Sequence, residues 1–429
     1  MKTNKKPLNF RTGRLIVTLV WFMACVLGAL FYLVSGTFDN FTDAFFESTS
    51  GFTTTGATVI TDLSEVPGYA LFFRSFTHWL GGMGIVVLFA AIIPSWGIKG
   101  QLAAYSETPG PDKGKFTSKF ADTAKDLYII YIVLTAALVI LLKVSDMNWL
   151  DSITTAFSTI ATGGFANYND NATSFSVQVR IILIVFMYIA GVNFNLYYKF
   201  RRQGLRVFIK DQELRFYTLI MAAGALLIFA ANSFFRPAET IGYNLLDSVF
   251  HVVSINTTTG FTFDNYDSWP TFSRMILFCF FFVGGCASST AGGIKVSRII
   301  ICLKLIKRSF SMRIHPYRIS KITINDHEVS SDIAIKTTGF VFTYLALLII
   351  GTLLISLNGL GFITSLSCAA SCLGNIGPGF GLIGPAFNYS MLDAFSKYVC
   401  SFLMLTGRLE IYTILILFSK YYWNPDRSK

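Results

Sequence analysis

One pattern occurs four times in this sequence: DAFFESTSGFTTTGAT (residues 43–58), DSITTAFSTIATGGFA (151–166), DSVFHVVSINTTTGFT (247–262) and TSLSCAASCLGNIGPG (364–379). Each copy mixes apolar and hydroxyl-bearing residues and ends in a glycine-containing turn. When the turns are aligned on Gly56, Gly163, Gly260 and Gly377, these glycines are 107, 97 and 117 residues apart. Self-similarity at such intervals indicates structural repeats.

Apolar segments flank every copy of the pattern. The chain is 53% hydrophobic and 14% charged, whereas a soluble domain carries about a quarter charged residues. Leu15–Val34 has no charged side chain and can cross a hydrocarbon core of about 30 Å as one helix. We expect it to be a retained span rather than a cleaved signal peptide. Further apolar segments are Leu127–Leu142, Ile181–Tyr198, Tyr217–Phe235, Met275–Phe282, Gly339–Leu357 and Tyr398–Phe418.

The four copies predict re-entrant pore helices. About a dozen residues precede each turn, too few to cross a bilayer. Irregular backbone at membrane depth is tolerated only where it is buried in protein or lines a water-filled path. We therefore expect an all-α integral membrane fold in which four M1–pore helix–M2 repeats surround a central pore with pseudo-fourfold symmetry. Four ordinary external turns are the alternative, which the fourfold recurrence disfavours.

The repeats divide the chain into four parts. They are residues 1–98, residues 99–215 with a preceding cytoplasmic linker, residues 216–321 with a broken second helix, and residues 322–429. Three pore helices are expected to begin at Asp43, Asp151 and Asp247, because a carboxylate suits the N–H groups and the positive dipole at a helix N-terminus.

The net charge of +11 is unevenly distributed. With the four turns placed outside, few basic residues are external, and most lie in the N-terminal tail, the C-terminus and the connections Lys99–Lys125, Lys199–Arg215 and Lys304–Lys336. This positive-inside pattern predicts cytoplasmic termini and favours contact with anionic lipid over binding to nucleic acid. Acidic residues such as Glu47 and Asp264 predominate on the outer side and would attract cations to the mouth.

The glycine turns are the candidate cation filter. A dehydrated ion needs protein oxygens in place of water, and glycine allows backbone conformations that present carbonyl groups. No candidate residue is charged. The predicted K⁺ filter comprises Thr54, Thr55, Gly56, Ala161, Thr162, Gly163, Thr258, Thr259, Gly260, Asn375, Ile376 and Gly377.

A second run of small residues interrupts the third repeat's second span. Such a run makes a poor helix, which predicts a broken helix whose loop gates the path below the filter. A close helix-packing face is the alternative. The run lacks the GK[ST] signature of a nucleotide-binding loop. The predicted gating loop comprises Gly284, Gly285, Cys286, Ala287, Ser288, Ser289, Thr290, Ala291, Gly292 and Gly293.

Arg408 interrupts the last apolar segment. An ionisable residue at membrane depth is costly and indicates function. We interpret Arg408 as a pore arginine that opposes the cation and bonds carbonyls of the gating loop. Pairing with Glu410, or snorkelling to the interface, is the alternative.

No catalytic constellation is present in the sequence, so an enzyme embedded in the membrane is disfavoured. The four histidines are scattered, without the spacing of metal ligands. Cys368 and Cys372 are four residues apart, but no second pair accompanies them, and we interpret the cysteines as structural. The only metal expected is K⁺ at the filter.

The motifs resemble those of the TrkH/KtrB superfamily of potassium transport subunits, and specifically its TrkH branch. Besides the four turns, the resemblance rests on HWLGGMGIVVL (from His78), ETPGP (from Glu107), GGCASSTAGGIKVSR (from Gly284) and GRLEIYTILILF (from Gly407). It implies one filter glycine per repeat, a gating loop at Gly284–Gly293 and a nearby arginine. It also implies a homodimer in the inner membrane of a prokaryote, on a cytoplasmic RCK ring protein similar to TrkA that binds the regulatory nucleotide.

The resemblance also sets the expected activity. We expect potassium uptake through the pore, with K⁺ as substrate and no organic cofactor in this chain. Sodium transport, or sodium-coupled potassium transport, is the nearest rival, and Gly56 disfavours it because a serine there would favour sodium. Members of the TrkH branch usually carry an extra helical pair before the first repeat. This chain is expected to lack that pair and its contacts.

Overall fold

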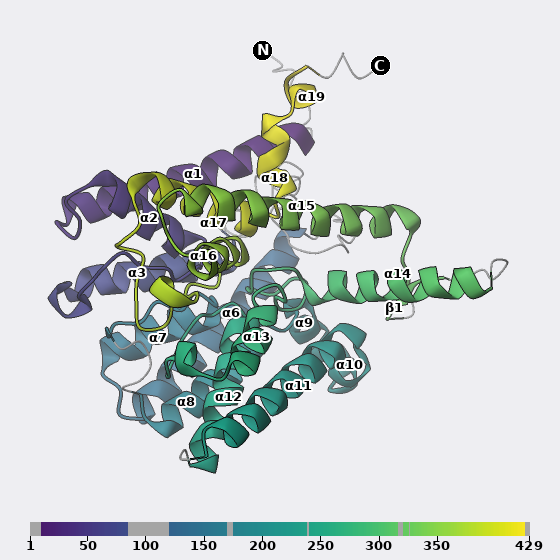
Figure 1. Cartoon of the computed structure of the whole chain (residues 1–429), viewed down its shortest axis with the longest axis horizontal. Coiled ribbons are helices and arrows are strands. Elements are labelled where there is room, and N and C mark those ends of the chain that lie inside the picture. The colour runs from purple at the N-terminus through teal and green to yellow at the C-terminus, as the bar shows by residue number, and fades with distance from the viewer. Residues whose placement is uncertain are drawn as a thin grey trace.

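The computed structural model describes residues 10–84, 120–169, 175–237, 240–315, 321–325 and 327–424. Helices form nearly all of the regular structure in these ranges (Figure 1). The strands among them are β1 (Thr323–Ile324) and β2 (His327–Glu328), which pair as one antiparallel hairpin. The expected all-α architecture is therefore confirmed.

Four helices of the described ranges are long and apolar enough to cross a bilayer, and two sharply bent pairs raise the number to six if each pair is one span. Each of the four long helices opens one repeat. They expose large apolar side chains such as Leu27 and Ile140, as contact with lipid requires. The long helices are α1 (Phe10–Val34), α6 (Phe120–Val144), α11 (Gln212–Phe235) and α15 (Ser331–Ser356).

A short helix packs against each long helix and leads into one glycine turn. These pore helices have 12 to 16 residues, and their C-terminal halves are buried. A buried helix too short to span is what the sequence pattern predicts. The pore helices are α2 (Phe41–Phe52), α7 (Trp149–Ile160), α12 (Ile241–Asn256) and α16 (Phe362–Gly374).

The prediction that aspartates begin the pore helices is wrong in detail. In α2 the N-cap is Asn40, whose side chain accepts a hydrogen bond from the backbone N–H of Asp43, and Asn148 does the same for Asp151 in α7. Asparagine caps a helix as well as aspartate does, and the carboxylate one turn later still meets the positive dipole end. Helix α12 begins at Ile241, so Asp247 lies in its second turn.

The second helix of each repeat differs in continuity. Helix α3 (Gly68–Gly82) is followed as far as residue 84, the pair α8 (Val177–Ala190) and α9 (Phe194–Gln203) is bent by 88°, and the pair beginning with α17 (Ala394–Arg408) is bent by 107°. In the third repeat, helix α13 (Thr271–Phe280) and helix α14 (Val296–Ile314) are separated by nonhelical chain. The remaining helical elements are η1 (Leu63–Glu65), α10 (Arg206–Lys210), η3 (Tyr266–Ser268), η4 (Gly381–Ile383), α18 (Tyr412–Leu415), η5 (Ile416–Phe418) and α19 (Lys420–Trp423).

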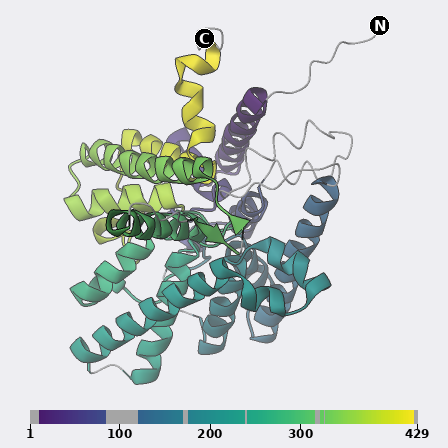
Figure 2. The same ribbon diagram turned by 90° about the vertical axis from the view of Figure 1, so that its right-hand side faces the viewer.

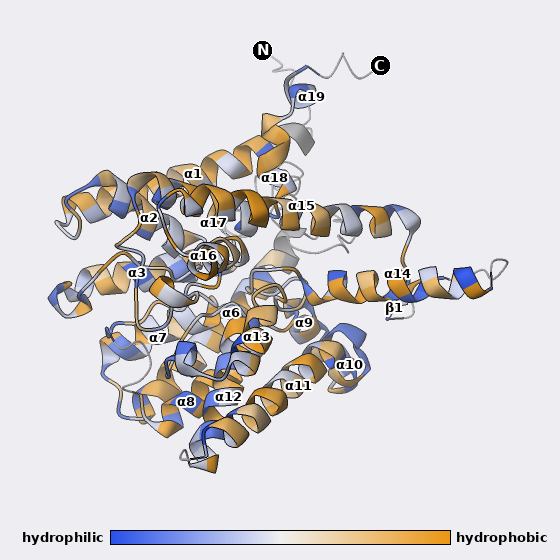
Figure 3. Ribbon diagram, in the orientation of Figure 1, coloured by the Kyte–Doolittle hydropathy of each residue, from blue (hydrophilic) through white to orange (hydrophobic). Residues whose placement is uncertain are grey.

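The start of α1 and helix α19, the first and last helices that the structure describes, lie on the same side of the molecule (Figure 1 and Figure 2). Apolar residues dominate α1, α15 and α17, whereas the far end of α14 and helix α10 are hydrophilic (Figure 3). The predicted boundary between residues 98 and 99 and the ETPGP motif lie outside the described residues. The predicted boundary after residue 215 falls in the first turn of α11, which begins at Gln212.

Candidate functional site: four glycine turns and the loop beneath them

The four turns adopt the same backbone conformation. Thr54, Thr162, Thr258 and Asn375 directly follow, or lie one residue beyond, the end of their pore helices and have φ angles between 53° and 57°. Two residues later, Gly56, Gly164, Gly260 and Gly377 also have positive φ, between 79° and 103°. Threonine rarely occupies the left-handed region, so its appearance there three times indicates a conformation fixed by the surroundings.

This geometry corrects the register of the second repeat. The glycine with positive φ is Gly164, not Gly163, and Thr162 aligns with Thr54. Gly163 therefore takes the place of Thr55, Thr259 and Ile376. The sequence contains two adjacent glycines at this turn, and the spacing alone could not identify the one that adopts positive φ.

Equivalent hydrogen bonds tie each turn to its pore helix. In each repeat a serine lies four residues before the left-handed residue. Its backbone carbonyl oxygen accepts a hydrogen bond from the N–H of the residue that follows the left-handed one. The four bonds are Thr55 to Ser50 at 2.9 Å, Gly163 to Ser158 at 2.7 Å, Thr259 to Ser254 at 2.8 Å and Ile376 to Ser371 at 3.0 Å. These bonds satisfy carbonyl groups that the end of a helix leaves without partners.

The turns contact one another in a closed ring. A Cβ atom added to Gly56 would lie 2.1 Å from the carbonyl oxygen of Gly163, in the second repeat. A Cβ at Gly164 would lie 1.9 Å from the oxygen of Thr259, one at Gly260 would lie 1.9 Å from that of Ile376, and one at Gly377 would lie 2.7 Å from that of Thr55. Each glycine therefore abuts the next repeat, and the fourth returns to the first. Only glycine fits such an approach.

The ring is uncharged and rich in oxygen atoms. The side chains of Thr54, Thr55, Thr258, Thr259 and Asn375 are buried there. The C-terminal ends of four pore helices converge on it, and these ends carry partial negative charge. Such an arrangement suits a cation that exchanges water for protein oxygens, and it offers no fixed positive charge for an anion.

The loop of the third repeat lies directly under this ring. The N–H of Gly292 donates to the Thr258 hydroxyl at 2.7 Å, and a Cβ on Gly292 would lie 2.3 Å from the carbonyl oxygen of Gly374. Other bonds join the loop to the bend of the second repeat: Cys286 N–H donates to Gly191 O at 2.9 Å, and Phe194 N–H donates to Ser288 O at 3.1 Å. The predicted break in the helix is present, and the loop bridges two repeats.

Arg408 joins three repeats beneath the ring. Its Nη1 donates to the carbonyl oxygen of Thr290 at 2.7 Å, and its Nη2 donates to those of Gly81 and Gly82 at 2.5 and 2.6 Å. The sequence predicts that Arg408 bonds backbone carbonyls of the Gly284–Gly293 loop, and the bond to Thr290 agrees with this prediction. Glu410, the alternative partner, instead pairs with Arg298.

Several residues that hold the loop were not singled out from the sequence. The buried carboxylate of Glu213 in α11 accepts the N–H of Ala287 at 2.7 Å and that of Ser297 at 3.0 Å. Buried Lys295 donates to the carbonyl oxygen of Ala291. A charged residue in the first turn of a membrane helix gives no local signal that its partner lies more than 70 residues away.

On the other side of the ring, a buried ion pair supports the first turn. Arg74 Nε lies 2.8 Å from Glu47 Oε1, and both side chains are buried. Glu47 also accepts the N–H of Val59 at 3.0 Å, and the Arg74 guanidinium stacks on Phe165 of the second repeat. The expectation that Glu47 contributes to an acidic mouth is therefore wrong, because its charge is buried and paired.

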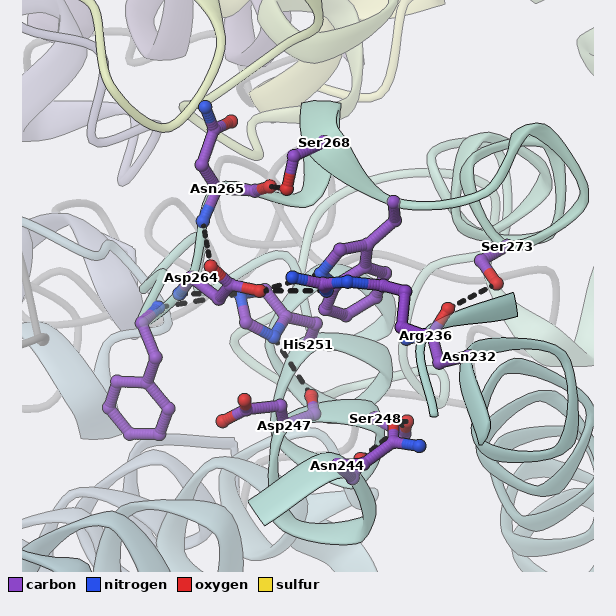
Figure 4. Close-up of polar contacts among 12 residues, drawn as sticks. Asn232, Arg236, Asn244, Asp247, Ser248, His251, Asp264, Asn265, Ser268 and Ser273 are labelled. Carbon is purple, nitrogen blue, oxygen red and sulfur yellow. Dashed lines mark hydrogen bonds and ion pairs between the residues drawn. The ribbon is translucent and has the colours of Figure 1, made fainter. Parts of the chain in front are cut away.

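The equivalent position in the third repeat is His251. Its Nδ1 donates to the carbonyl oxygen of Asp247 at 2.8 Å, and its Nε2 accepts the N–H of Phe263 at 3.3 Å. Figure 4 shows the imidazole of His251 between Asp247 and Asp264, with the Arg236 side chain directed toward Asp264. Partial burial opposes ionisation of Asp264, but the hydrogen bond from Trp269 and nearby positive charge hold the pKa of Asp264 below its usual value.

These features define a class of protein: a multi-pass membrane protein whose four re-entrant helices meet in one ring. The family model for TrkH, described as a cation transport protein, matches residues 1–426. The chain belongs to this family.

Individual relatives agree with the family match. The Trk system potassium uptake protein TrkH of Escherichia coli K12 is 36% identical over 98% of this chain and 88% of its own length. The Trk system potassium uptake protein TrkG of the same organism is 33% identical over 98% of this chain and 87% of its own length. The crystal structure of the potassium transporter TrkH from Vibrio parahaemolyticus matches with a TM-score of 0.88 at 34% identity, covering 99% of this chain and 88% of that chain.

Proposed function

We propose that this protein is the pore subunit of a potassium-uptake system. The closed ring of glycine contacts carries the proposal, since it brings four uncharged turns together at the ends of four pore helices. The names of the relatives, which are potassium uptake proteins, support K⁺ as the substrate. The ion sheds water at the ring, and no organic cofactor in this chain takes part.

Within this proposal, the filter comprises the twelve residues predicted from the sequence together with Gly164. Backbone carbonyls replace the hydration shell of K⁺, and the threonine hydroxyls brace the turns. The Thr53 and Thr55 hydroxyls lie 2.8 Å apart, as do those of Thr257 and Thr259, which supports a bracing role.

The loop Gly284–Gly293 is the proposed gate, and Arg408 is the residue proposed to hold it closed. The loop occupies the space under the ring, and its bonds to Thr258 and Arg408 hold it there. Transport then requires the loop to move aside. Deleting residues 287–293 should raise the flux of the isolated subunit, and an unchanged flux would reject the gate.

We further propose cytoplasmic termini, a homodimer in the inner membrane of a prokaryote, and control by a cytoplasmic RCK ring protein that binds a nucleotide. The distribution of basic residues supports the orientation, and the resemblance to the TrkH branch supports the assembly. The partner would act on the loop from the side of α14.

The test is ion uptake by the purified chain in liposomes. Tracer rubidium influx is measured against competing K⁺ and Na⁺, with and without the cytoplasmic partner. Competition by K⁺ at far lower concentration than Na⁺ would support a potassium filter. Equal competition would favour the rival sodium or nonselective pathway, and no influx even with the partner would reject a pore.

A further inference from the structure

Three cysteine thiols lie close together between α16 and α17, next to the glycine turn of the fourth repeat. Cys368 and Cys372 lie one turn apart on α16, and Cys400 faces them from α17. All three are buried, and their sulfur atoms lie within 4.8 Å of one another, with the Sγ atoms of Cys368 and Cys400 3.5 Å apart. The sequence gives no local signal for the third thiol, because Cys400 lies 28 positions after Cys372 and on a different helix.

The geometry of the cluster selects a kind of ion. Thiolate ligands favour soft cations such as Cu(I) over the hard K⁺, which prefers oxygen. Metal–sulfur bonds of about 2.3 Å place three sulfurs about 4 Å apart around a central ion, and the observed trio lies in this range. In the described part of the chain, no fourth histidine, cysteine or carboxylate joins the group, which disfavours the tetrahedral geometry of structural zinc.

We propose that Cys368, Cys372 and Cys400 form a three-sulfur site for a soft monovalent cation, Cu(I) or Ag(I). Binding breaks one S–H bond and sends its proton to solvent: the resulting thiolate is the principal ligand, and the other two sulfurs approach the ion as weaker, neutral thiol donors. The resulting complex has no net charge. A buried complex without net charge avoids the large desolvation cost of a buried ion.

The site is coupled to the fourth turn through short contacts. The carbonyl oxygen of Gly377 accepts hydrogen bonds from Tyr389 Oη at 2.6 Å and from Ser371 Oγ at 2.8 Å. Ser371 directly precedes Cys372 in the chain, so the backbone of α16 links this thiol to one of the two donors. An ion that brings the three sulfurs to a common spacing of about 4 Å moves the backbone of α16 at Cys372 and therefore shifts Ser371, one of the two groups that hold Gly377. We expect an occupied site to reduce ion flux, an effect that rests on the proposed function.

The binding test uses Ag⁺ and two matched variants of the purified full chain. The first retains the trio and replaces Cys25, Cys279, Cys286 and Cys302 with serine or alanine. The second retains those four and carries Cys368→Ala, Cys372→Ala and Cys400→Ala. The first variant should bind one Ag⁺ per chain with three sulfur neighbours by X-ray absorption, and the second should lack this site. A melting temperature for each variant shows that it is folded.

Folded variants that bind Ag⁺ equally, or a trio variant that binds none, would overturn the site. Coupling is tested separately by tracer rubidium flux in liposomes. Ag⁺ should reduce flux about fivefold or more in the trio variant, the lower end of typical coupling between two sites, and leave the other variant unaffected. Equal inhibition of both would overturn the coupling while leaving the binding result intact. Absence of flux in both variants without Ag⁺, even with the cytoplasmic partner present, would count against the proposed function, and the binding measurement distinguishes the two failures.

Discussion

Arg408 donates a 2.7 Å hydrogen bond to the carbonyl oxygen of Thr290, so the last residue of α17 holds the loop of the third repeat. The same guanidinium also holds the end of α3 through Gly81 and Gly82. One side chain thus fixes the relative positions of three repeats directly below the glycine ring. These three bonds all go to backbone carbonyls, and lysine cannot reproduce the planar fork that makes them.

Replacing Arg408 with alanine should increase flux. The substitution removes a fixed positive charge from the proposed ion path and removes the bonds that tie the loop to two other repeats. A coupling of about 1–3 kcal/mol corresponds to a change of about 5- to 150-fold, so we expect tracer influx to rise at least fivefold without the partner. Arg408→Lys separates the two effects, because it keeps the charge and loses the fork. Wild-type flux in both variants would reduce Arg408 to a structural charge.

Glu213→Ala should also loosen the loop Gly284–Gly293, the proposed gate. It leaves the N–H groups of Ala287 and Ser297 without the carboxylate that accepts them, and each unsatisfied buried group costs about 1–3 kcal/mol. We expect higher basal influx and faster hydrogen exchange in the loop. Glu213→Gln keeps one acceptor oxygen and serves as the matched control with a smaller effect. Unchanged exchange at Ala287 in the alanine variant would contradict the assignment.

Serine at a ring glycine should weaken discrimination between ions. Gly56→Ser places a Cβ atom against the carbonyl oxygen of Gly163 in a left-handed conformation, and a penalty of 1.4 kcal/mol already corresponds to about tenfold in binding. The K⁺ over Na⁺ preference in tracer competition should fall by about that factor. Gly36→Ser is the control, because Gly36 also has positive φ but has no atom near its Cβ position.

The corrected register of the second repeat can be tested in the same assay. Gly164→Ser should reproduce the loss caused by Gly56→Ser, because its Cβ would lie 1.9 Å from the oxygen of Thr259. A normal ion preference in a folded Gly164→Ser protein would show that the ring contacts do not set selectivity at this turn.

Breaking the Glu47–Arg74 pair should destabilise the protein. Glu47→Gln leaves the guanidinium charge buried, and removing one partner of such a pair costs about 3–5 kcal/mol. We expect a clearly lower melting temperature in detergent, partly restored by adding Arg74→Met. Lys321→Ala breaks an ion pair whose side chains are 64% and 55% exposed, and an exposed pair contributes only about 0–1 kcal/mol. Equal shifts in the two single variants would contradict the burial argument.

The sequence predicted the fold because its signals are local. Hydrophobic length identifies the spans, and the repeated turns identify the four re-entrant units. The filter and gate roles stay predictions. The register of Gly163 and Gly164, and the partners of Glu47, depend on contacts between repeats. A single sequence carries no local signal for such contacts. In the same way, the residues around Cys368 in the sequence do not indicate that Cys400 lies beside it in the folded chain.

The ring of glycine contacts has a consequence for variation. In a pore assembled from four identical chains, any substitution in the filter appears four times at once. Here Gly56, Gly164, Gly260 and Gly377 are separate codons, so one quarter of the ring can change while three stay as they were. The residues directly before these glycines already differ between the repeats: they are Thr55, Gly163, Thr259 and Ile376. If the ring is the filter, as proposed, each of its four parts can therefore vary independently of the other three.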